Sequence, residues 1–456
     1  MQRRALLQLG LVAATTLGAP TLALAAGKAI LANAHGAVGD GRTLNTKAIQ
    51  TAIDEAAKTG ATVAFKPGVY RTGSIFLKSG VTLRLDKGVT LLGSQNLADY
   101  PELPTRVAGI ELTWPAALVN VYRQKNVRIV GDGTIDGDGK VFWDSYWALR
   151  RKYDPKGLRW AADYDCKRPR LIQVFDSEQV ELAGPRLRRA GFWTVHVCYS
   201  HDVHIADLEI RNNEGGRGPS TDGVDIDSSH DVLVERIDVA CNDDALCLKA
   251  GRDADGLRVA RPTYNVVIRD CVIRDASAGI TFGSETSGGF HDIKVSGLKV
   301  HHPTPVGILF KSAHTRGGAV RDIDIAGMEL QDVFTVFRVN LNWNPTYSYA
   351  EIPAGMTDVP PYWKVMTQHV PPEQGRCRLS DVRVKDIKAI GAKTAFEVAA
   401  FSDLPLERFA FTDLDLDVQA GGRIANARDW TFTRSRIDTL DGKPPEVVES
   451  SGVTGL

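Results

Sequence analysis

Short apolar stretches, interrupted every few residues by polar positions, recur along most of the chain. Each unit starts with Asn, Asp or a similar polar residue and continues as Val or Ile, any residue, Val or Ile, before a second short apolar stretch. Between residues 179 and 322, successive units start roughly 23 to 34 residues apart, a spacing that indicates a solenoid of stacked repeats. The units begin at Asn126, Gln179, Asp202, Asp231, Asn265, Asp292, Asp322, Asp381 and Glu407.

This repeat predicts the fold class. Leucine-rich repeats are excluded because the helical segments and the leucine spacing that they need are absent, and a β-propeller needs four strands in each blade of about 40 residues. The pattern instead predicts an all-β protein, a single right-handed parallel β-helix (a solenoid) over residues 26–456, with an N-terminal capping helix and surface insertions. Alternate Val, Ile and Leu would fill its core, and the 43 glycines suit its many turns.

One amphipathic helix is predicted near the N-terminus. Asn45 or Thr46 can cap it, Ile49, Ile53 and Ala57 recur at helical spacing, and Gly60 ends it. A helix in this place suits a β-helix, whose first coil must be covered against water.

Two insertions interrupt the repeat, at about residues 141–170 and 341–373. The first interleaves cations with Trp143, Trp147, Tyr153 and Trp160, and the second is rich in Trp and Tyr. Insertions on a solenoid often shape a binding groove, and rings and cations together suit an acidic saccharide. The alternative, which the sequence leaves open, is that these aromatic residues pack as a local lid or satellite core.

Residues 1–25 have the features of an export signal. Arg3 and Arg4 precede an apolar run that ends in the small-residue pattern of Ala23 to Ala25. The paired arginines fit either the twin-arginine route or an ordinary secretory signal. We therefore expect a mature chain that begins near Ala26, lies in the periplasm or outside the cell, and contains no membrane-spanning segment.

The amino-acid composition limits the classes of ligand that the protein is expected to bind. A formal net charge of +0 gives no basic surface, so we expect no nucleic-acid partner. The six cysteines lack tight ligand spacing, so neither zinc nor an iron–sulfur cluster is indicated, and we expect no metal or other cofactor. Buried free thiols are the expected state of most of them, although one disulfide remains possible in an oxidising compartment.

Three aspartates suggest the chemistry. Asp222 and the adjacent pair Asp243 and Asp244 lie about one coil apart, and neighbouring coils stack about 4.8 Å apart, so we expect one cluster of carboxylates. Glycoside hydrolysis needs such a cluster, with one carboxyl protonated and another ionised. Alternatively, these aspartates only form turns. Adjacent residues of a regular strand point to opposite faces, so Asp243 and Asp244 converge only if the backbone bends.

These features resemble glycoside hydrolase family 28, the polygalacturonase-like pectinases. The resemblance rests on the N-terminal stretch GAVGDGRTLNTKAIQTAID and on the ordered series STDG, NDD, GSE and Lys311 at one-coil spacings, and it covers nearly all of the chain after the signal. It implies an inverting hydrolase that needs no metal. It also implies that Asp243 is the general acid, whereas Asp222 and Asp244 hold the attacking water.

The chain departs from the family pattern at two places. Ser277 occupies the place of a histidine, and Leu309 that of an arginine, so that only Lys311 remains of the cationic motif. His196 either replaces part of the lost function or has a structural role. The expected substrate-binding residues are Lys311, His196, Ser277, Arg316 and Glu285.

We therefore expect an exported hydrolase that cleaves α-linked galacturonic acid in pectin, acting on chain ends or side chains of an acidic pectic polysaccharide or oligosaccharide. If a sugar ring meets Leu309, that ring should be neutral, or turned so that its carboxylate faces Lys311 or the basic insertion at 150–170, and long homogalacturonan should react slowly. Three alternatives remain: a rhamnogalacturonan or rhamnoside hydrolase of the same family, a polysaccharide lyase, and a non-catalytic glycan binder.

Overall fold

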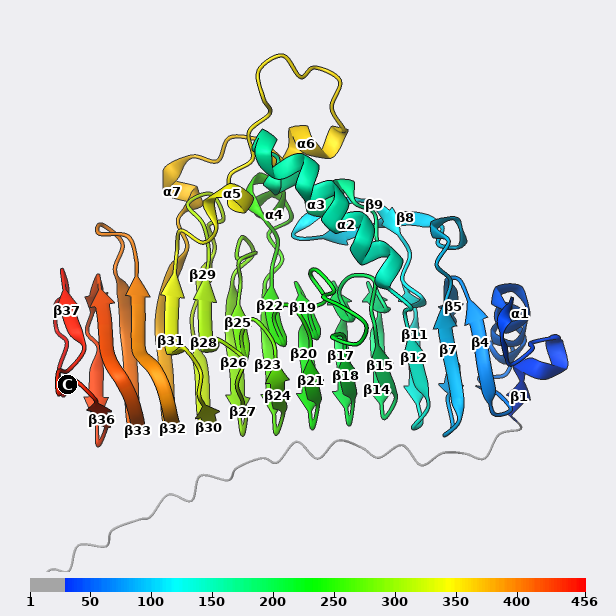
Figure 1. Ribbon diagram of the computed structural model, residues 1–456, viewed down its shortest axis with the longest axis horizontal. Coiled ribbons are helices and arrows are strands. Elements are labelled where there is room, and N and C mark those ends of the chain that lie inside the picture. The colour runs from blue at the N-terminus through cyan, green and yellow to red at the C-terminus, as the bar shows by residue number, and fades with distance from the viewer. Residues whose placement is uncertain (1–28) are drawn as a thin grey trace, which may run out of the picture.

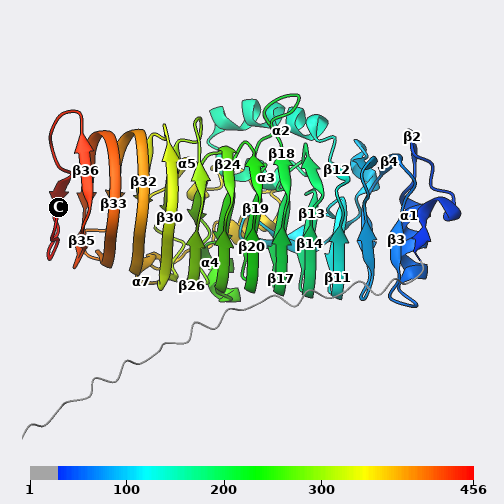
Figure 2. The same ribbon diagram turned by 90° about the horizontal axis from the view of Figure 1, so that it is seen from below.

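The computed structural model describes residues 29–456, so the predicted export signal lies outside the described residues. The chain winds into a long solenoid in which each full coil contributes one strand to each of three parallel sheets (Figures 1 and 2). Parallel β-coils of this kind adopt the right-handed crossover. The predicted fold class, a right-handed parallel β-helix, is therefore confirmed.

The sheets are named by the order in which a central coil passes through them. The first contains β5 (Ile75–Leu77), β10 (Val119–Tyr122), β13 (Ile172–Phe175), β16 (Val195–Cys198), β19 (Val224–Asp227), β22 (Leu246–Lys249), β25 (Ile280–Phe282), β28 (Val306–Lys311) and β31 (Thr335–Asn340). The second contains β1 (Ile30–Leu31), β3 (Thr62–Ala64), β6 (Thr82–Arg84), β11 (Lys125–Val130), β14 (Glu178–Ala183), β17 (His201–Ala206), β20 (His230–Glu235), β23 (Thr263–Arg269), β26 (Phe290–Ser296) and β29 (Ala319–Val320). The third contains β2 (Asp40–Leu44), β4 (Gly68–Thr72), β7 (Val89–Gly93), β12 (Thr134–Asp136), β15 (Arg186–Arg188), β18 (Glu209–Arg211), β21 (Asp238–Ala240), β24 (Val272–Asp275) and β27 (Lys299–Val300).

Towards the C-terminus the strands become longer and pass from one sheet into the next. This part of the solenoid contains β30 (Ile323–Gln331), β32 (Arg378–Ala399), β33 (Leu406–Ala425), β34 (Ala427–Arg428), β35 (Thr431–Thr433), β36 (Arg436–Thr439) and β37 (Glu446–Val448).

The polar residue that starts each repeat unit forms a corner of the solenoid. Its φ lies between 49° and 57° at each of the first eight predicted starts, from Asn126 to Asp381, and at the ninth the neighbouring Arg408 takes this conformation with φ 55°. Asn and Asp tolerate the left-handed region better than other side chains do, because their short polar groups hydrogen-bond locally. The repeat that the sequence reveals is thus a row of stacked bends.

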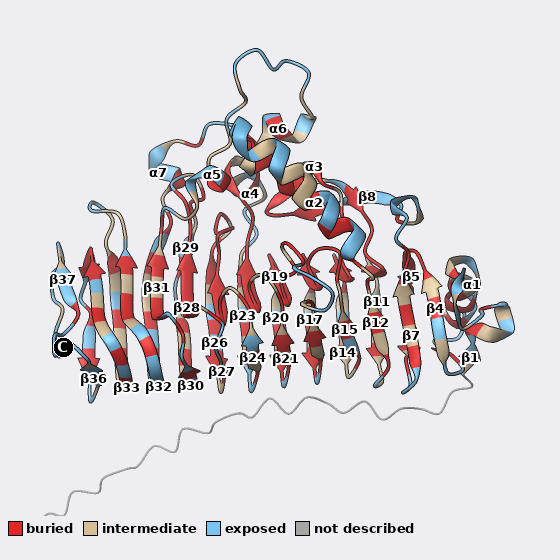
Figure 3. Ribbon diagram, viewed as in Figure 1, coloured by how far each residue is buried: buried red, intermediate tan, exposed pale blue. Residues whose placement is uncertain are grey.

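A continuous apolar core runs along the solenoid axis (Figure 3). The N-terminal end is closed by α1 (Thr46–Ala56), which buries Ile49, Ala52, Ile53 and Ala56 against the first coils. The predicted capping helix is therefore confirmed, although the side chain of its N-terminal residue Asn45 accepts a hydrogen bond from the Val38 amide and does not cap the helix.

The insertions gather over the first sheet, above the middle coils (Figure 1). They contain α2 (Lys140–Tyr153), α3 (Ala162–Asp165), α5 (Pro345–Ser348), α6 (Pro361–Met366) and α7 (Pro372–Gly375). Outside the two insertions, the chain adds α4 (Asp253–Val259) and an antiparallel hairpin of β8 (Glu102–Val107) and β9 (Ile110–Pro115). Trp160 and Trp363 pack edge-to-face at 4.7 Å in a second apolar cluster, which also includes Trp114 and Trp193. For these residues the interpretation as a satellite core is correct.

All six cysteines are buried and free, as expected for most of them. Among the helices of residues 29–456, none combines the length and the apolar composition that a membrane crossing requires.

The corner conformation predicts a selective effect of mutation at Asp386, an exposed residue with φ 55° in β32. Asp386→Val should lower the free energy of unfolding by about 1–2 kcal/mol, because a β-branched residue resists the left-handed region. The neighbouring Lys385→Val is the control, since Lys385 is also exposed but has ordinary strand geometry. Equal stability of the two variants in denaturant unfolding would show that the corners impose no such constraint.

Candidate active site

Parallel pairing stacks the outward side chains of the first sheet into rows. His196 pairs with Asp225, which pairs with Cys247, and the same row continues through Thr281 to Leu309. Two residues further along each strand, a second row contains Cys198, Asp227 and Lys249. Residues far apart in sequence therefore lie side by side beneath the insertions.

The three aspartates form one cluster. Asp222 lies just before β19, and Asp243 and Asp244 lie in the bend between β21 and β22. One carboxylate oxygen from each lies within 4.8 Å of the others. The bend allows the adjacent aspartates to converge, and the expected clustering, with Lys311 nearby, is confirmed. Their catalytic roles remain a prediction.

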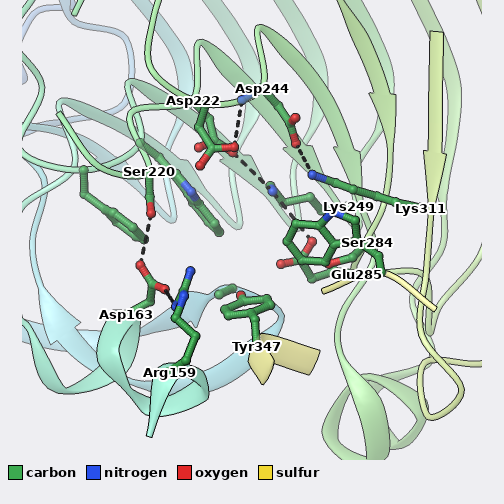
Figure 4. Close-up of a pocket in the computed structure, with 15 residues that line it drawn as sticks. Arg159, Asp163, Ser220, Asp222, Asp244, Lys249, Ser284, Glu285, Lys311 and Tyr347 are labelled. Atoms are coloured by element: carbon green, nitrogen blue, oxygen red, sulfur yellow. Dashed lines mark hydrogen bonds and ion pairs between the residues drawn. The ribbon is translucent and has the colours of Figure 1, made fainter. Parts of the chain in front are cut away.

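Two lysines supply positive charge to this cluster (Figure 4). Lys311 Nζ donates a hydrogen bond of 2.7 Å to Asp244 Oδ2 and lies 4.5 Å from the centre of the Trp343 ring. Lys249 Nζ lies 3.4 Å from both Asp222 Oδ2 and Asp225 Oδ1, 3.7 Å from Glu285 Oε2, and 4.7 Å from the Trp193 ring centre.

These surroundings separate the acids by their affinity for protons. Burial would raise the pKa of Asp244, but Lys311 and Lys249 hold it below its usual value. Burial and then Asp244 raise the pKa of Asp243. Burial, followed by Asp225 and Asp243, raises the pKa of Asp222 well above its usual range, and burial raises that of Asp225 to about 7. The site thus combines one carboxyl group of lowered pKa with neighbours whose pKa values are raised.

The insertions form the wall opposite the aspartates. Arg159 donates to Asp163 at 2.7 Å, and its guanidinium lies 4.9 Å from the Tyr347 ring centre. Asp163 also accepts from Arg168 and from Ser220 Oγ, at 2.9 and 3.0 Å. Burial opposes the charge of Asp163, but Arg159 and Arg168 hold its pKa at about 2. Asp163 therefore serves as an ionised anchor of the wall and not as an acid.

The β8–β9 hairpin closes the groove on the side of the earlier coils. Arg106 of β8 is fully buried and donates a hydrogen bond of 2.9 Å to Asp227, the residue paired with Lys249 on the next coil. At the hairpin turn, Ala108 lines the pocket, and its carbonyl accepts a bond from Tyr164 Oη. Gly109 has φ 82°, and a Cβ there would lie 2.4 Å from that of Arg252, so only glycine allows this close approach.

The expected substrate-binding residues separate into two groups. Lys311 and Glu285 line the pocket with the three aspartates. Ser277 Oγ donates to Asp244 at 2.8 Å and to Asp243 at 3.3 Å, so it bonds the acids themselves.

His196 and Arg316 do not line the pocket, and their assignment to substrate binding is corrected. His196 is fully buried, where it accepts a 2.7 Å hydrogen bond from Arg170 at Nδ1, and burial lowers its pKa to about 4. Arg316 is fully buried and bonds Asp253 below the second insertion. Both are hidden because the insertions and the hairpin cover their coils.

Leu309 also differs from expectation. Its side chain packs with Ala278 and Val306 in a small apolar cluster and is only 6% exposed. Leu309 is not among the residues that line the pocket, so the structure offers no contact between Leu309 and a sugar ring on which a preference against homogalacturonan could rest.

Sequence reasoning missed Lys249, Asp225 and Trp193. A signal for Lys249 is present, because Leu246–Lys249 reads LCLK and the end of β28 reads ILFK. Both end a strand of the first sheet with a lysine, so the strand pattern around Lys249 resembles that around Lys311.

Within residues 29–456, two groups of residues have the side chains and spacing for a metal ion. One is the aspartate cluster, which already faces Lys249 and Lys311. The other is His196, Cys198 and Asp227, where Arg106 bonds Asp227 and Arg170 bonds His196. In both groups side-chain cations occupy the positions from which a metal would bind, so the donor sets fit a metal poorly.

Comparisons with known proteins agree with this geometry. A family model described as glycosyl hydrolases family 28 matches residues 61–350. A probable polygalacturonase of Vitis vinifera is 33% identical over 319 residues, which are 68% of this chain and 62% of that protein. An exo-poly-α-D-galacturonosidase of Dickeya chrysanthemi is 26% identical over 462 residues, covering 92% of this chain and 72% of that protein.

Solved structures give the same result. The structure of a hyperthermoactive exopolygalacturonase from Thermotoga maritima matches with a TM-score of 0.72 at 25% identity, over 88% of this chain and 87% of that one. The chain therefore belongs to glycosyl hydrolases family 28 and is an O-glycosyl hydrolase.

Proposed function

We propose that the protein is an exported, inverting hydrolase that removes α-linked galacturonic acid from the ends of pectic chains. The observation that carries this proposal is a cluster of three aspartates in a pocket that the insertions and the hairpin turn help to line. The relatives named as polygalacturonases and exo-galacturonosidases support the substrate class.

In this proposal Asp243 is the general acid. It is the one aspartate of the cluster without a cation at ion-pair distance within residues 29–456, and burial and Asp244 raise its pKa, which favours its protonated form. Asp243 would protonate the glycosidic oxygen as the bond to the anomeric carbon breaks.

Asp222 and Asp244 would hold the attacking water. Asp244 is held ionised by Lys311, and Asp222 lies beside Lys249. Water attacks the anomeric carbon on the face opposite the leaving group and transfers its proton to this pair. Each turnover thus consumes one water and leaves a hydroxyl on each product.

The spacing of the acids is short for an inverting enzyme. Inverting glycosidases usually separate the two carboxyl groups by about 6.5–9.5 Å to leave room for water, whereas these oxygens lie within 4.8 Å of one another. Inversion is compatible with this spacing if the two bases hold the water between them and next to the acid. The anomeric configuration of the released product therefore tests the proposal directly.

The closed groove supports action at chain ends. A polysaccharide threaded along the first sheet would have to pass over Asp227, but Arg106 covers it, and Ala108 at the hairpin tip meets the pocket. A chain end fits this arrangement and a mid-chain segment does not. Lys311 and Arg159 at the pocket supply positive charge that suits a uronate.

Export of the protein rests on the sequence of residues 1–25. Fractionation of the source cells, followed by N-terminal sequencing of the mature protein, tests it.

Asp243→Asn should hydrolyse oligogalacturonate about a hundred- to ten-thousand-fold more slowly than wild type, because the amide keeps the shape but cannot donate the required proton. Released galacturonate measures this effect, and binding of oligogalacturonate should persist. Asp132→Asn, at an exposed turn, is the matched control and should be fully active. Near-normal turnover by Asp243→Asn would place the acid elsewhere.

The wild-type protein should release galacturonate monomer from polygalacturonate from the earliest times. The viscosity of the solution should fall only slightly. An enzyme that cleaves in mid-chain would lower the viscosity strongly after the same number of bonds had been cleaved. A ladder of oligomers with a rapid loss of viscosity would refute end-directed action.

A further inference from the structure

Lys249 is the pocket cation whose bonds are least satisfied. Lys311 and Arg159 each donate a hydrogen bond of 2.7 Å to a carboxylate. Lys249 has ion-pair neighbours at 3.4 Å or beyond, and within residues 29–456 its ammonium makes no hydrogen bond. The carboxylates that it faces are also incompletely bonded, because Asp222 Oδ1 and both oxygens of Asp225 are buried without a hydrogen-bond partner in the same part of the chain.

The two lysines stand in the same relation to the two proposed bases. Lys249 and Lys311 end strands of the first sheet two coils apart, and the strand between them, β25, ends just before Gly283. Lys311 pairs with Asp244, and Lys249 pairs with Asp222. The position between the lysines carries no side chain, so both ammonium groups face the aspartates.

We propose that Lys249 is a positioning residue that keeps Asp222 available as the second base, so that each base lies beside a lysine and the acid Asp243 lies beside none. This inference rests on the proposed function, in which Asp222 and Asp244 hold the attacking water.

The acidic groups around Asp222 explain why it needs a neighbouring cation to remain ionised. Asp225 of β19 lies on one side, and Asp243 and Asp244 approach from the bend before β22. Glu285, from the loop after β25, faces the same lysine. Lys249 of β22 is the only cation within ion-pair distance of Asp222 in residues 29–456.

The alternative role for Lys249 is to bind a substrate carboxylate. Its ammonium is already surrounded by Asp222, Asp225 and Glu285, and its side chain is only 5% exposed. A further anion would have to compete with these three acids. The geometry therefore points to the acids as its partners, and the two roles give different kinetic results.

The test is the pH dependence of kcat in the variant Lys249→Met, which keeps the length of the side chain but removes its charge. A base must be ionised, so activity falls as the pH drops through its pKa. Loss of an adjacent cation raises that pKa, so the acid limb of the profile should move up by about one to three pH units. Asp225 has a pKa of about 7 and is therefore neutral on the acid limb, so Asp225→Asn should leave the limb in place, and the double variant should move it up as Lys249→Met does.

Lys299→Met is the matched control. Lys299 of β27 also lies 3.4 Å from a carboxylate, that of Glu329, but this pair is exposed and lies away from the pocket. Its pH profile should equal that of the wild type. If Lys249→Met fails to accumulate as folded protein, the double variant carries the test, because it removes a carboxyl partner of Lys249 together with the buried cation.

Each outcome decides the question. A raised KM with an unmoved acid limb in Lys249→Met would assign Lys249 to substrate binding and overturn the proposal. Reduced thermal stability with an unmoved limb would assign it to folding, with the same consequence. Failure of the proposed function is distinguishable, because the wild-type protein would then release no galacturonate at any pH.

Discussion

The structure depends on the in-register stacking of parallel coils. Each coil adds one strand to each sheet at a spacing of about 4.8 Å, so a residue at a given place in one coil lies directly over its counterpart in the next. Asp225 of β19 and Cys247 of β22 are such a pair, as are Asp227 and Lys249. The same stacking keeps the bend residues in a row, and it brings Asp222 of one coil to the Asp243–Asp244 bend of the next. The active site is therefore a consequence of the repeat.

Stacking also brings several carboxyl groups close together, and two lysines offset part of their mutual repulsion. Asp222, Asp225, Asp243 and Asp244 meet in a small buried volume, where burial and like charges raise the pKa values of Asp222, Asp225 and Asp243. Two lysines face these four carboxyl groups and cannot neutralise all of them. The positions of Lys311 and Lys249 decide which acids are ionised. The insertions strengthen this effect because they exclude water from the cluster.

The sequence predicted what depends on the repeat and failed where separate segments meet. The bends at Asn126 and its counterparts, the capping helix and the aspartate cluster all follow from local pattern and coil spacing. The β8–β9 hairpin was not predicted, because its short apolar stretches look the same as solenoid strands and local pattern does not distinguish antiparallel from parallel pairing. His196, Leu309 and Arg316 were misassigned for a related reason. Whether an outward residue reaches the substrate depends on which insertion covers its coil. The spacing of residues along the chain does not show which coils the insertions cover.

In the proposed mechanism, two carboxylates deliver water while a third carboxyl group protonates the leaving group. The most direct test is proton NMR of the anomeric configuration of galacturonate at the moment of its release from an α-linked oligogalacturonate. Single displacement by water predicts that the β-anomer appears first and only later equilibrates with the α-anomer. If the α-anomer appeared first, one of the closely spaced aspartates would have to act as a nucleophile, and the assignment of Asp222 and Asp244 as water-holding bases would be wrong.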